Sequence, residues 1–151
     1  MLTNIQITQI YVLDQEKALD FYVGTLGLEV HTDLDLGFMR WLTVNFPGQP
    51  DDQLLLELPA PPAYDEATAE QIRELLTKGA AGMAAIVSVD DVRKTYEELV
   101  AQGVEFTEEP TERFYGTDCG LRDPFGNPLR IGTPKEGTVE VPEPGRAAAQ
   151  D

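Results

Sequence analysis

The sequence predicts an α+β fold that is made of two tandem βαβββ modules. The first observation is an internal repeat with a constant offset of 76 residues (90 − 14 = 76), which relates Asp14 to Asp90, Gly27 to Gly103 and Glu29 to Glu105. The second is the pattern around each repeat, in which short runs of β-branched and apolar residues are separated by turn-forming glycines and prolines. A constant offset across an element boundary favours a duplicated supersecondary unit, although any two strand–helix–strand segments share part of this pattern.

The first module is expected to span residues 1–60 and to begin with a strand at 5–13. Asp14 then acts as a helix N-cap, and apolar residues recur after it at helical spacing. Gly27 ends this helix because glycine adopts the left-handed conformation without strain. Three further strands are predicted at 28–34, 38–46 and 53–58, separated by Gly37 and by a segment rich in proline, glycine and aspartate.

A linker at 61–80 is expected next. The prolines at 59, 61 and 62 cannot continue a central strand, and an amphipathic helix at 65–78 follows them and ends at Gly79. The linker therefore separates the two modules.

The second module, at 81–134, repeats the plan of the first. It is expected to contain a strand at 83–89, a helix at 90–102 that Asp90 caps and Gly103 ends, and strands at 104–107, 113–122 and 129–133. Residues 1–134 thus form a single domain. The segment 135–151 is rich in Pro, Gly, Glu and Ala and is predicted to be a disordered tail.

Composition narrows the class of protein. A chain of 151 residues with 42% hydrophobic and 25% charged residues suits one globular domain. The net charge of −16 argues against binding to nucleic acid or to an anionic membrane surface, and it would attract cationic ligands or serve solubility alone. No apolar run is long enough to cross a bilayer. The start of the chain lacks the features of a secretory signal, and the single cysteine fits a reducing compartment, so we expect a cytoplasmic protein.

Three short motifs carry a family resemblance. The motifs are Phe21-Tyr22 and Leu26-Gly27 on the first helix, and Asp123-Pro124-Phe125-Gly126-Asn127 before the last strand. Together with the two βαβββ modules they resemble the vicinal oxygen chelate superfamily, which includes glyoxalase I, bleomycin-resistance proteins and extradiol dioxygenases, over roughly residues 5–133. The resemblance implies a cupped, half-open barrel whose concave face holds a ligand, often with a divalent metal, and it implies a homodimer. It does not by itself assign a reaction.

The resemblance also implies where a metal would be bound, on the first and last strands of each module. Those positions hold Ile7, Glu57, Ala84 and Arg130, with Gln9 one inward step beyond Ile7. Alanine has no donor atom and arginine stays protonated, so two of the four positions cannot bind a metal. We therefore expect no metal cofactor and no ordinary glyoxalase I or extradiol dioxygenase chemistry; a divalent metal with atypical ligands is the alternative. His31 lies outside these positions and is expected to face solvent.

The candidate ligand-binding residues come from two sources. Gln9, Glu57 and Arg130 stand at or beside the positions that the resemblance implies. Strand parity adds Tyr11 and, on a strand whose inward face the sequence does not decide, Trp41; Tyr115, Asp118 and Arg122 are expected near the mouth of the second module. Several of them have a structural alternative: Trp41 as core filler, the Tyr115–Asp118 segment as a bulged strand, and a Glu57–Arg130 pair that only closes the cup. Loss of stability without loss of binding in Arg130→Ala would favour the last alternative. Cys119 is expected to be an inert buried thiol.

Two functions are compatible with these residues. The first is a metal-free binding protein of the bleomycin-resistance type that sequesters a cationic or aromatic small molecule. The second is an enzyme of the superfamily, a lyase, isomerase or dioxygenase, with an atypical metal site or with metal-free acid–base catalysis by Glu57.

Overall fold

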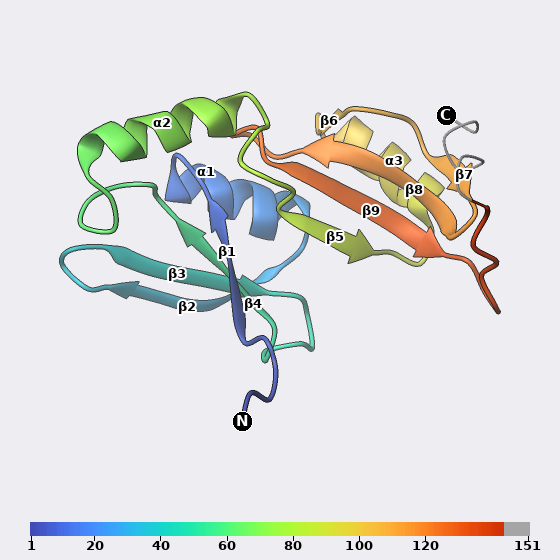
Figure 1. Ribbon diagram of the computed structural model, residues 1–151, viewed down its shortest axis with the longest axis horizontal. Helices are drawn as coiled ribbons and strands as arrows, with labels where there is room; N and C mark the ends of the chain where they lie inside the picture. The colour runs from blue at the N-terminus through green and yellow to red at the C-terminus, as the bar shows by residue number, and fades with distance from the viewer. Residues whose placement is uncertain (144–151) are drawn as a thin grey trace. The chain divides into compact units, whose positions relative to one another are not determined.

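The computed structural model describes residues 1–143, and these residues form two compact units (Figure 1). One unit consists of Met1–Ala84 together with Asp123–Asn127, and the other consists of Ala85–Arg122 together with residues 128–143. The predicted tail at 135–151 is described in part: residues 135–143 contain no helix or strand, and 144–151 lie outside the described residues. None of the helices in residues 1–143 is long and apolar enough to cross a membrane.

The first unit contains a mixed four-stranded sheet in the order β1-β4-β3-β2. Strand β1 (Ile7–Tyr11) runs parallel to β4 (Gln53–Glu57), which is antiparallel to β3 (Arg40–Asn45). Strand β3 is in turn antiparallel to β2 (Glu29–Asp35), and the two form a long hairpin (Figure 1). All four strands lie at the predicted places.

The first helix has two parts. Helix α1 (Gln15–Leu19) begins at Asp14, whose side chain accepts a hydrogen bond from the Lys17 amide at 3.0 Å, as predicted. It continues as a π-helix, η1 (Asp20–Thr25), in which the Leu26 amide donates to the Phe21 carbonyl five residues earlier. Gly27 ends the segment with φ 81°, also as predicted.

The apolar core of the first unit lies on one face of its sheet. Ile10, Leu42 and Leu56 share a row across β1, β3 and β4 and are 2% exposed or less. Helix α1 contacts β4, and Ala18, Phe21 and Tyr22 of the helical segment are buried as well. This assignment leaves Gln9, Tyr11, Trp41, Thr43 and Glu57 on the opposite face, since side chains alternate along a strand.

The second unit has a five-stranded sheet. Strand β5 (Ala85–Ser88) is parallel to β9 (Pro128–Pro134), and β9 is antiparallel to β8 (Gly116–Arg122). Strand β8 pairs on its other side with two short strands in turn, β6 (Glu105–Phe106) and β7 (Thr111–Arg113). Figure 1 shows β9 between β5 and β8, with α3 (Val92–Ala101), which contacts β8 and β9, beside them.

Two predicted boundaries in the second unit are wrong. The N-cap of α3 is Asp91 rather than Asp90, because the Asp91 side chain accepts hydrogen bonds from the Arg93 and Lys94 amides at 3.1 Å. The strand predicted at 113–122 is a hairpin, in which Phe114 and Tyr115 turn the chain between β7 and β8. Helix α2 (Glu66–Thr77) lies where the linker helix was predicted, with Asp65 as its N-cap and Gly79 after its end.

The turn Asp123–Asn127 comes late in the sequence but belongs to the first unit. Asp123 Oδ1 accepts hydrogen bonds from the Phe125 and Asn127 amides, both at 2.9 Å, and Asn127 Nδ2 donates to the Tyr11 carbonyl at 2.7 Å. Gly126 has φ 104°, and a Cβ there would lie 2.5 Å from the Leu76 carbonyl oxygen. The glycine in this motif is therefore required by both backbone conformation and space.

Candidate functional site

Four predicted site residues, Gln9, Tyr11, Trp41 and Glu57, lie on the face of the first sheet that is opposite its apolar core. Tyr11 pairs directly with Glu57 across the β1–β4 ladder, and Gln9 precedes Tyr11 by two residues on the same face. Trp41 lies on the same face of β3, beyond Thr43–Leu55, the last pair of the β3–β4 ladder. Side chains directly opposite one another in a sheet lie about 5 Å apart at Cβ. Tyr11 and Glu57 thus form one row, and Trp41 belongs to the same face of the next strand but one from β1.

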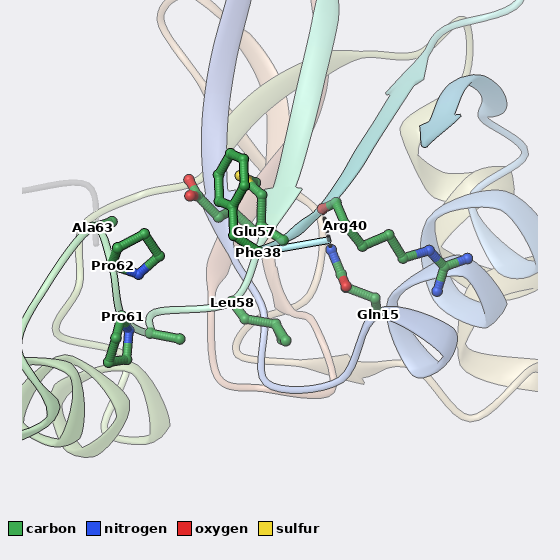
Figure 2. A pocket seen from close by; sticks show the side chains of 10 residues that line it. Gln15, Phe38, Arg40, Glu57, Leu58, Pro61, Pro62 and Ala63 are labelled. Carbon is green, nitrogen blue, oxygen red and sulfur yellow. Dashed lines mark hydrogen bonds between the residues drawn. The ribbon is translucent and has the colours of Figure 1, made fainter. Parts of the chain in front are cut away.

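A cavity of about 340 Å³ opens at the end of this row (Figure 2). Glu57 and Phe38 lie on one side of it, and the loop that contains Pro61, Pro62 and Ala63 lies on the other. Leu58 connects the two sides, and the peptide bond between Pro61 and Pro62 is cis. The volume suits a drug-sized organic molecule.

The base of the cavity is fixed by Gln15. Its Nε2 donates to the Arg40 carbonyl at 3.1 Å and to the Leu56 carbonyl at 3.0 Å, so the start of β3 and the end of β4 are tied to α1. Figure 2 shows the bond to the Arg40 carbonyl as a dashed line. The guanidinium of Arg40 is bound elsewhere, to both carboxylate oxygens of Asp33 and to Glu16. Arg40 therefore lines the cavity with its charge already compensated.

Glu57 is the charged group of the cavity that has no counterion. Within the described residues of the first unit its carboxylate makes no hydrogen bond or ion pair, and it is half-buried. Desolvation by burial raises the pKa of Glu57 above its ordinary value, because a partly apolar environment disfavours the ionised form. A cation bound next to the carboxylate would offset the free-energy cost of ionising Glu57 in this environment.

Phe38 is the aromatic group of the cavity. It is 65% exposed at the tip of the β2–β3 hairpin, next to Gly37. Leu34 and Leu36 on the same hairpin are also exposed, at 50% and 41%. A large apolar side chain at an exposed hairpin tip, beside an unpaired carboxylate, provides a surface for the apolar part of a ligand.

Tyr11 forms a hydroxyl pair with Tyr64, which follows the cavity loop. The two hydroxyl groups are hydrogen-bonded, and the rings make an edge-to-face contact with centroids 6.1 Å apart. Burial, and after it the hydrogen bond with Tyr64, raises the pKa of Tyr11 to about 12. Tyr11 is therefore a neutral phenol throughout the physiological range.

The site residues predicted in the second module form a different kind of cluster. Asp118 accepts hydrogen bonds from Arg113 Nε at 2.8 Å and from Arg130 Nε at 2.9 Å, and Tyr115 donates to it at 2.9 Å. Glu108 accepts from the Nη2 atoms of the same two arginines. Each arginine thus pairs with both carboxylates. We call this cluster the four-residue ion-pair ring; it consists of Arg113, Asp118, Arg130 and Glu108.

The geometry of this ring depends on Gly120. A Cβ at Gly120 would lie 2.6 Å from Thr107 Oγ1 and 3.3 Å from Arg130 Nη1, so the arginine occupies space that a side chain would fill. Burial raises the pKa of Asp118, but the hydrogen bonds from Arg130, Arg113 and Tyr115 outweigh it, and the net pKa lies below its ordinary value. Arg122 ends β8, where it pairs in register with Glu105 and Pro128. A small cavity of about 140 Å³ lies beside Tyr115, Asp118 and Ser88.

The residues present do not fit a metal ion of the kind that the resemblance implies. No group of three or more His, Cys, Asp or Glu side chains that could hold a metal occurs in the described part of the chain. The ladders also refine the alignment of the modules: Glu57 pairs with Tyr11 as Arg130 pairs with Ile86, so Gln9, rather than Ile7, is the counterpart of Ala84. Glu57 and Gln9 provide two donors at most, and the predicted pairing of Glu57 with Arg130 stays a prediction.

Two further residues behave as the sequence indicated. His31 is exposed and its ring nitrogen bonds to the Thr32 hydroxyl at 2.8 Å. Cys119 is fully buried, and burial together with the charges of Asp118 and Glu108 raises the pKa of its thiol to about 11. Both predictions are confirmed.

Sequence reasoning missed the loop wall of the cavity, Phe38 and Tyr64, and it missed Glu108 and Arg113 as partners of Asp118. A signal existed for Phe38, since a large aromatic residue directly after a turn glycine is unusual for a buried position. Tyr64, Glu108 and Arg113 carry no comparable local signal. Thr43 lies on the same face of the first sheet as Glu57. Its hydroxyl is buried and has no hydrogen-bond partner within residues 1–143.

Comparison with known proteins places the chain in a family. The model of the Glyoxalase/Bleomycin resistance protein/Dioxygenase superfamily matches residues 4–131. The uncharacterized protein YurT of Bacillus subtilis (strain 168) is 35% identical over 128 residues, which cover 85% of this chain and 97% of YurT.

Two solved structures are also similar. UcmS2 matches with a TM-score of 0.82 and 38% identity, covering 87% of this chain and 98% of UcmS2. TnmS3, described as an antibiotic binding protein from Streptomyces sp. CB03234, matches with a TM-score of 0.70 and 28% identity, covering 89% of this chain and 98% of TnmS3. The family model covers most of the chain, and the fold agrees with these structures. The chain belongs to the glyoxalase/bleomycin resistance protein/dioxygenase superfamily.

Proposed function

We propose that this protein binds a small organic molecule that carries a cationic nitrogen on an apolar or aromatic body, and that it does so without a metal. The observation that carries this proposal is the half-buried carboxylate of Glu57, which has no partner within the described residues of the first unit and lies in a cavity with largely apolar walls. Such a carboxylate is complementary to an ammonium or guanidinium group.

The surroundings of Glu57 support a ligand of this class. Phe38 presents an exposed ring on the same side of the cavity, where it can contact an aromatic ring or a cation. Pro61, Pro62 and Leu58 supply apolar surface for the ligand body. The net charge of −16 adds a long-range attraction for cations.

The comparisons support a binding role rather than a particular ligand. The superfamily includes bleomycin-resistance proteins, and TnmS3 is described as an antibiotic binding protein. At 28% identity TnmS3 shares the fold, and its ligand cannot be transferred to this chain. Sequestration of a cationic or aromatic compound is the function that fits both the family and the cavity.

The experiment compares two matched probes by isothermal titration calorimetry. We expect 2-naphthylmethylamine, a cation at neutral pH, to bind at least about tenfold more tightly than the neutral 2-naphthylmethanol, because a charge-assisted contact contributes about 1.5–3 kcal/mol. Glu57→Gln should remove this preference. Glu97→Gln, which makes the same charge change on an exposed position of α3, should retain it. Equal affinities for both probes in the wild-type protein would contradict the proposal.

A second candidate is an enzyme of the superfamily in which Glu57 acts as a general base. The raised pKa of this carboxyl favours it, because a base is most effective when its pKa approaches the working pH. Metal analysis of the purified protein addresses the metal-dependent form of this alternative. Stoichiometric Zn, Ni, Mn or Fe, lost on chelation together with an activity, would favour the enzyme.

We also infer the assembly and the location of the protein. The family resemblance favours a homodimer, and the single cysteine favours the reducing environment of the cytoplasm. Sedimentation velocity would test the dimer, with a mass near twice 16.7 kDa as the expected result.

A further inference from the structure

We propose that the Tyr11–Tyr64 hydroxyl pair is a second recognition point beside Glu57, which donates a hydrogen bond to an acceptor oxygen of the ligand. This inference rests on the proposed binding of an organic cation and adds to it a requirement on ligand chemistry. The ligand class that it selects is an arylalkylamine, a cation at neutral pH, with a hydroxyl or ether oxygen about two carbon atoms from its nitrogen.

The position of the pair follows from the sheet and from the cavity loop. Tyr11 is the direct ladder partner of Glu57, so the two side chains stand next to each other on the same face. Tyr64 follows Ala63, which lines the cavity on the side opposite Glu57. The hydroxyl pair therefore connects strand β1 to the loop that forms one wall of the cavity, and each tyrosine is next to a residue that lines the cavity.

The chemistry of the pair leaves one proton available. Each phenol has one O–H donor and can accept as well, and the hydrogen bond between them uses one of the two protons. The other proton has no acceptor among the described residues of the first unit. Gln9 also contacts Tyr11, but this contact lowers the pKa of Tyr11, so the Gln9 amide donates in it and does not take the proton. Both orders of donation lead to the same result, because whichever hydroxyl accepts keeps its own O–H for a third partner.

The surroundings of the pair favour donation rather than proton loss. The pKa of Tyr11 is raised to about 12 by burial first, then by the hydrogen bond with Tyr64, and to a smaller extent by the charge of Glu57, while the Gln9 amide acts in the opposite direction. An ionised Glu57 can only accept hydrogen bonds from a ligand, whereas the tyrosine pair has one hydrogen bond to donate. Two adjacent groups of opposite hydrogen-bonding character match a ligand that presents an N–H donor and an oxygen acceptor close together.

The inference assigns a binding contribution to Tyr64, which neither lines the cavity nor is charged. A purely structural pair would hold the loop wall in place and would affect all ligands alike. A recognition point would instead discriminate between ligands that differ only in the oxygen atom. The two roles are therefore separable by matched probes.

The test uses 2-(2-naphthyl)ethylamine and 2-amino-1-(2-naphthyl)ethanol, which differ by one hydroxyl group, in calorimetric titrations. We expect the wild-type protein to bind the amino alcohol about 3–10-fold more tightly, as one neutral hydrogen bond contributes about 0.5–1.5 kcal/mol. The double variant Tyr11→Phe/Tyr64→Phe should bind the two probes equally. Tyr96→Phe, which removes a hydroxyl from α3, should keep the wild-type preference.

A measurement on the wild-type protein makes the test independent of how well the double variant folds. The chain has five tyrosines, and labelling their Cζ atoms with ¹³C gives five resonances that single variants assign. The amino alcohol should shift the resonance of Tyr11 or Tyr64 more than the plain amine does, and the Tyr96 resonance should not move. Equal shifts with both probes, or an unchanged preference in the folded double variant, would overturn the inference. Failure of the plain amine to bind the wild-type protein would instead overturn the proposed function.

Discussion

The hydroxyl of Tyr22 on the π-helical segment donates a buried hydrogen bond of 2.7 Å to Asp123 Oδ2, across 101 positions of sequence. Asn127 Nδ2 donates to the same carboxylate oxygen at 2.6 Å. Burial, followed by the charge of Asp123 and this hydrogen bond, raises the pKa of Tyr22, so the phenol remains a neutral donor. Two motifs that carry the family resemblance, Phe21-Tyr22 and the turn at 123–127, are therefore in direct contact.

Tyr22→Phe should lower the free energy of unfolding by about 1.5–3 kcal/mol, because it leaves a buried carboxylate without one of its donors. In a chain of this length that corresponds to a fall in Tm of roughly 4–10 °C. Differential scanning calorimetry would measure it. Tyr96→Phe serves as the control, and a loss no larger than in that variant would show that the Asp123 contact contributes little.

Gly126→Ala should be far more destabilising than Gly24→Ala. At Gly126 the backbone φ is 104° and a Cβ would meet the Leu76 carbonyl and Thr77, whereas at the exposed Gly24 nothing lies within 4 Å. We expect a loss of about 2 kcal/mol or more for the first change, and a gain of about 0.4–1 kcal/mol for the second from the reduced entropy of the unfolded chain. Urea unfolding would give the midpoint concentration for each variant. Similar midpoints for Gly126→Ala and Gly24→Ala would refute the role given to Gly126.

Glu57→Gln should raise the Tm of the ligand-free protein at pH 7. The pKa of Glu57 is raised on folding, so its stabilising contribution is complete below the unfolded value near 4.5 and is lost as the pH rises through the folded value. The variant does not undergo this loss, and the difference in Tm should shrink to zero towards pH 4. A gain that is independent of pH would mean that packing rather than ionisation causes it.

Binding of 2-naphthylmethylamine should weaken as the pH falls through the raised pKa of Glu57. The cation binds the ionised carboxylate, and protonation competes with it. Below that pKa the affinity should fall up to about tenfold per pH unit until the carboxylate in the complex is also protonated. Calorimetric titrations between pH 4 and 8 would trace this curve. Affinity that stays constant over the range would place the cation away from Glu57.

Arg130→Ala should destabilise the second unit by about 1–3 kcal/mol, between the values typical of exposed and of buried ion pairs. It removes one donor each from Asp118 and Glu108 in the four-residue ion-pair ring. Because the pKa of Asp118 is lowered on folding, the wild-type protein should lose this stability as the pH falls below about 4, and the variant should lose less. Arg93→Ala, on the exposed face of α3, is the control.

The sequence predicts the local elements well where one residue determines them. Asp14 caps the first helix and Gly27 ends it, and the alternation on β1 correctly separates Ile10 from Gln9 and Tyr11. The π-helical turn was not predictable, since it has no composition of its own. The choice between Asp90 and Asp91 as N-cap was also not predictable, because both residues have the same side chain.

Contacts between distant segments account for the remaining differences. Tyr64 meets Tyr11 because the loop after β4 returns to β1, and Arg113 meets Asp118 because the hairpin turns at Phe114 and Tyr115. The spacing and periodicity of residues predict neither the course of this loop nor the position of this hairpin turn. The unpaired state of Glu57 is a property of the whole first unit, which explains why its position was predicted but its lack of a partner was not.

The membership of the turn 123–127 in the first unit has a consequence for biosynthesis. A ribosome would have to translate the chain through residue 127 before Phe125 and Asn127 could join the strands and helices built from residues 1–84. The nascent segment 1–84 would thus wait, with part of its apolar surface uncovered, for a piece of chain that is made later. Emergence of the turn 123–127, rather than of residues 1–84, would then be the event that permits cooperative folding of the first unit.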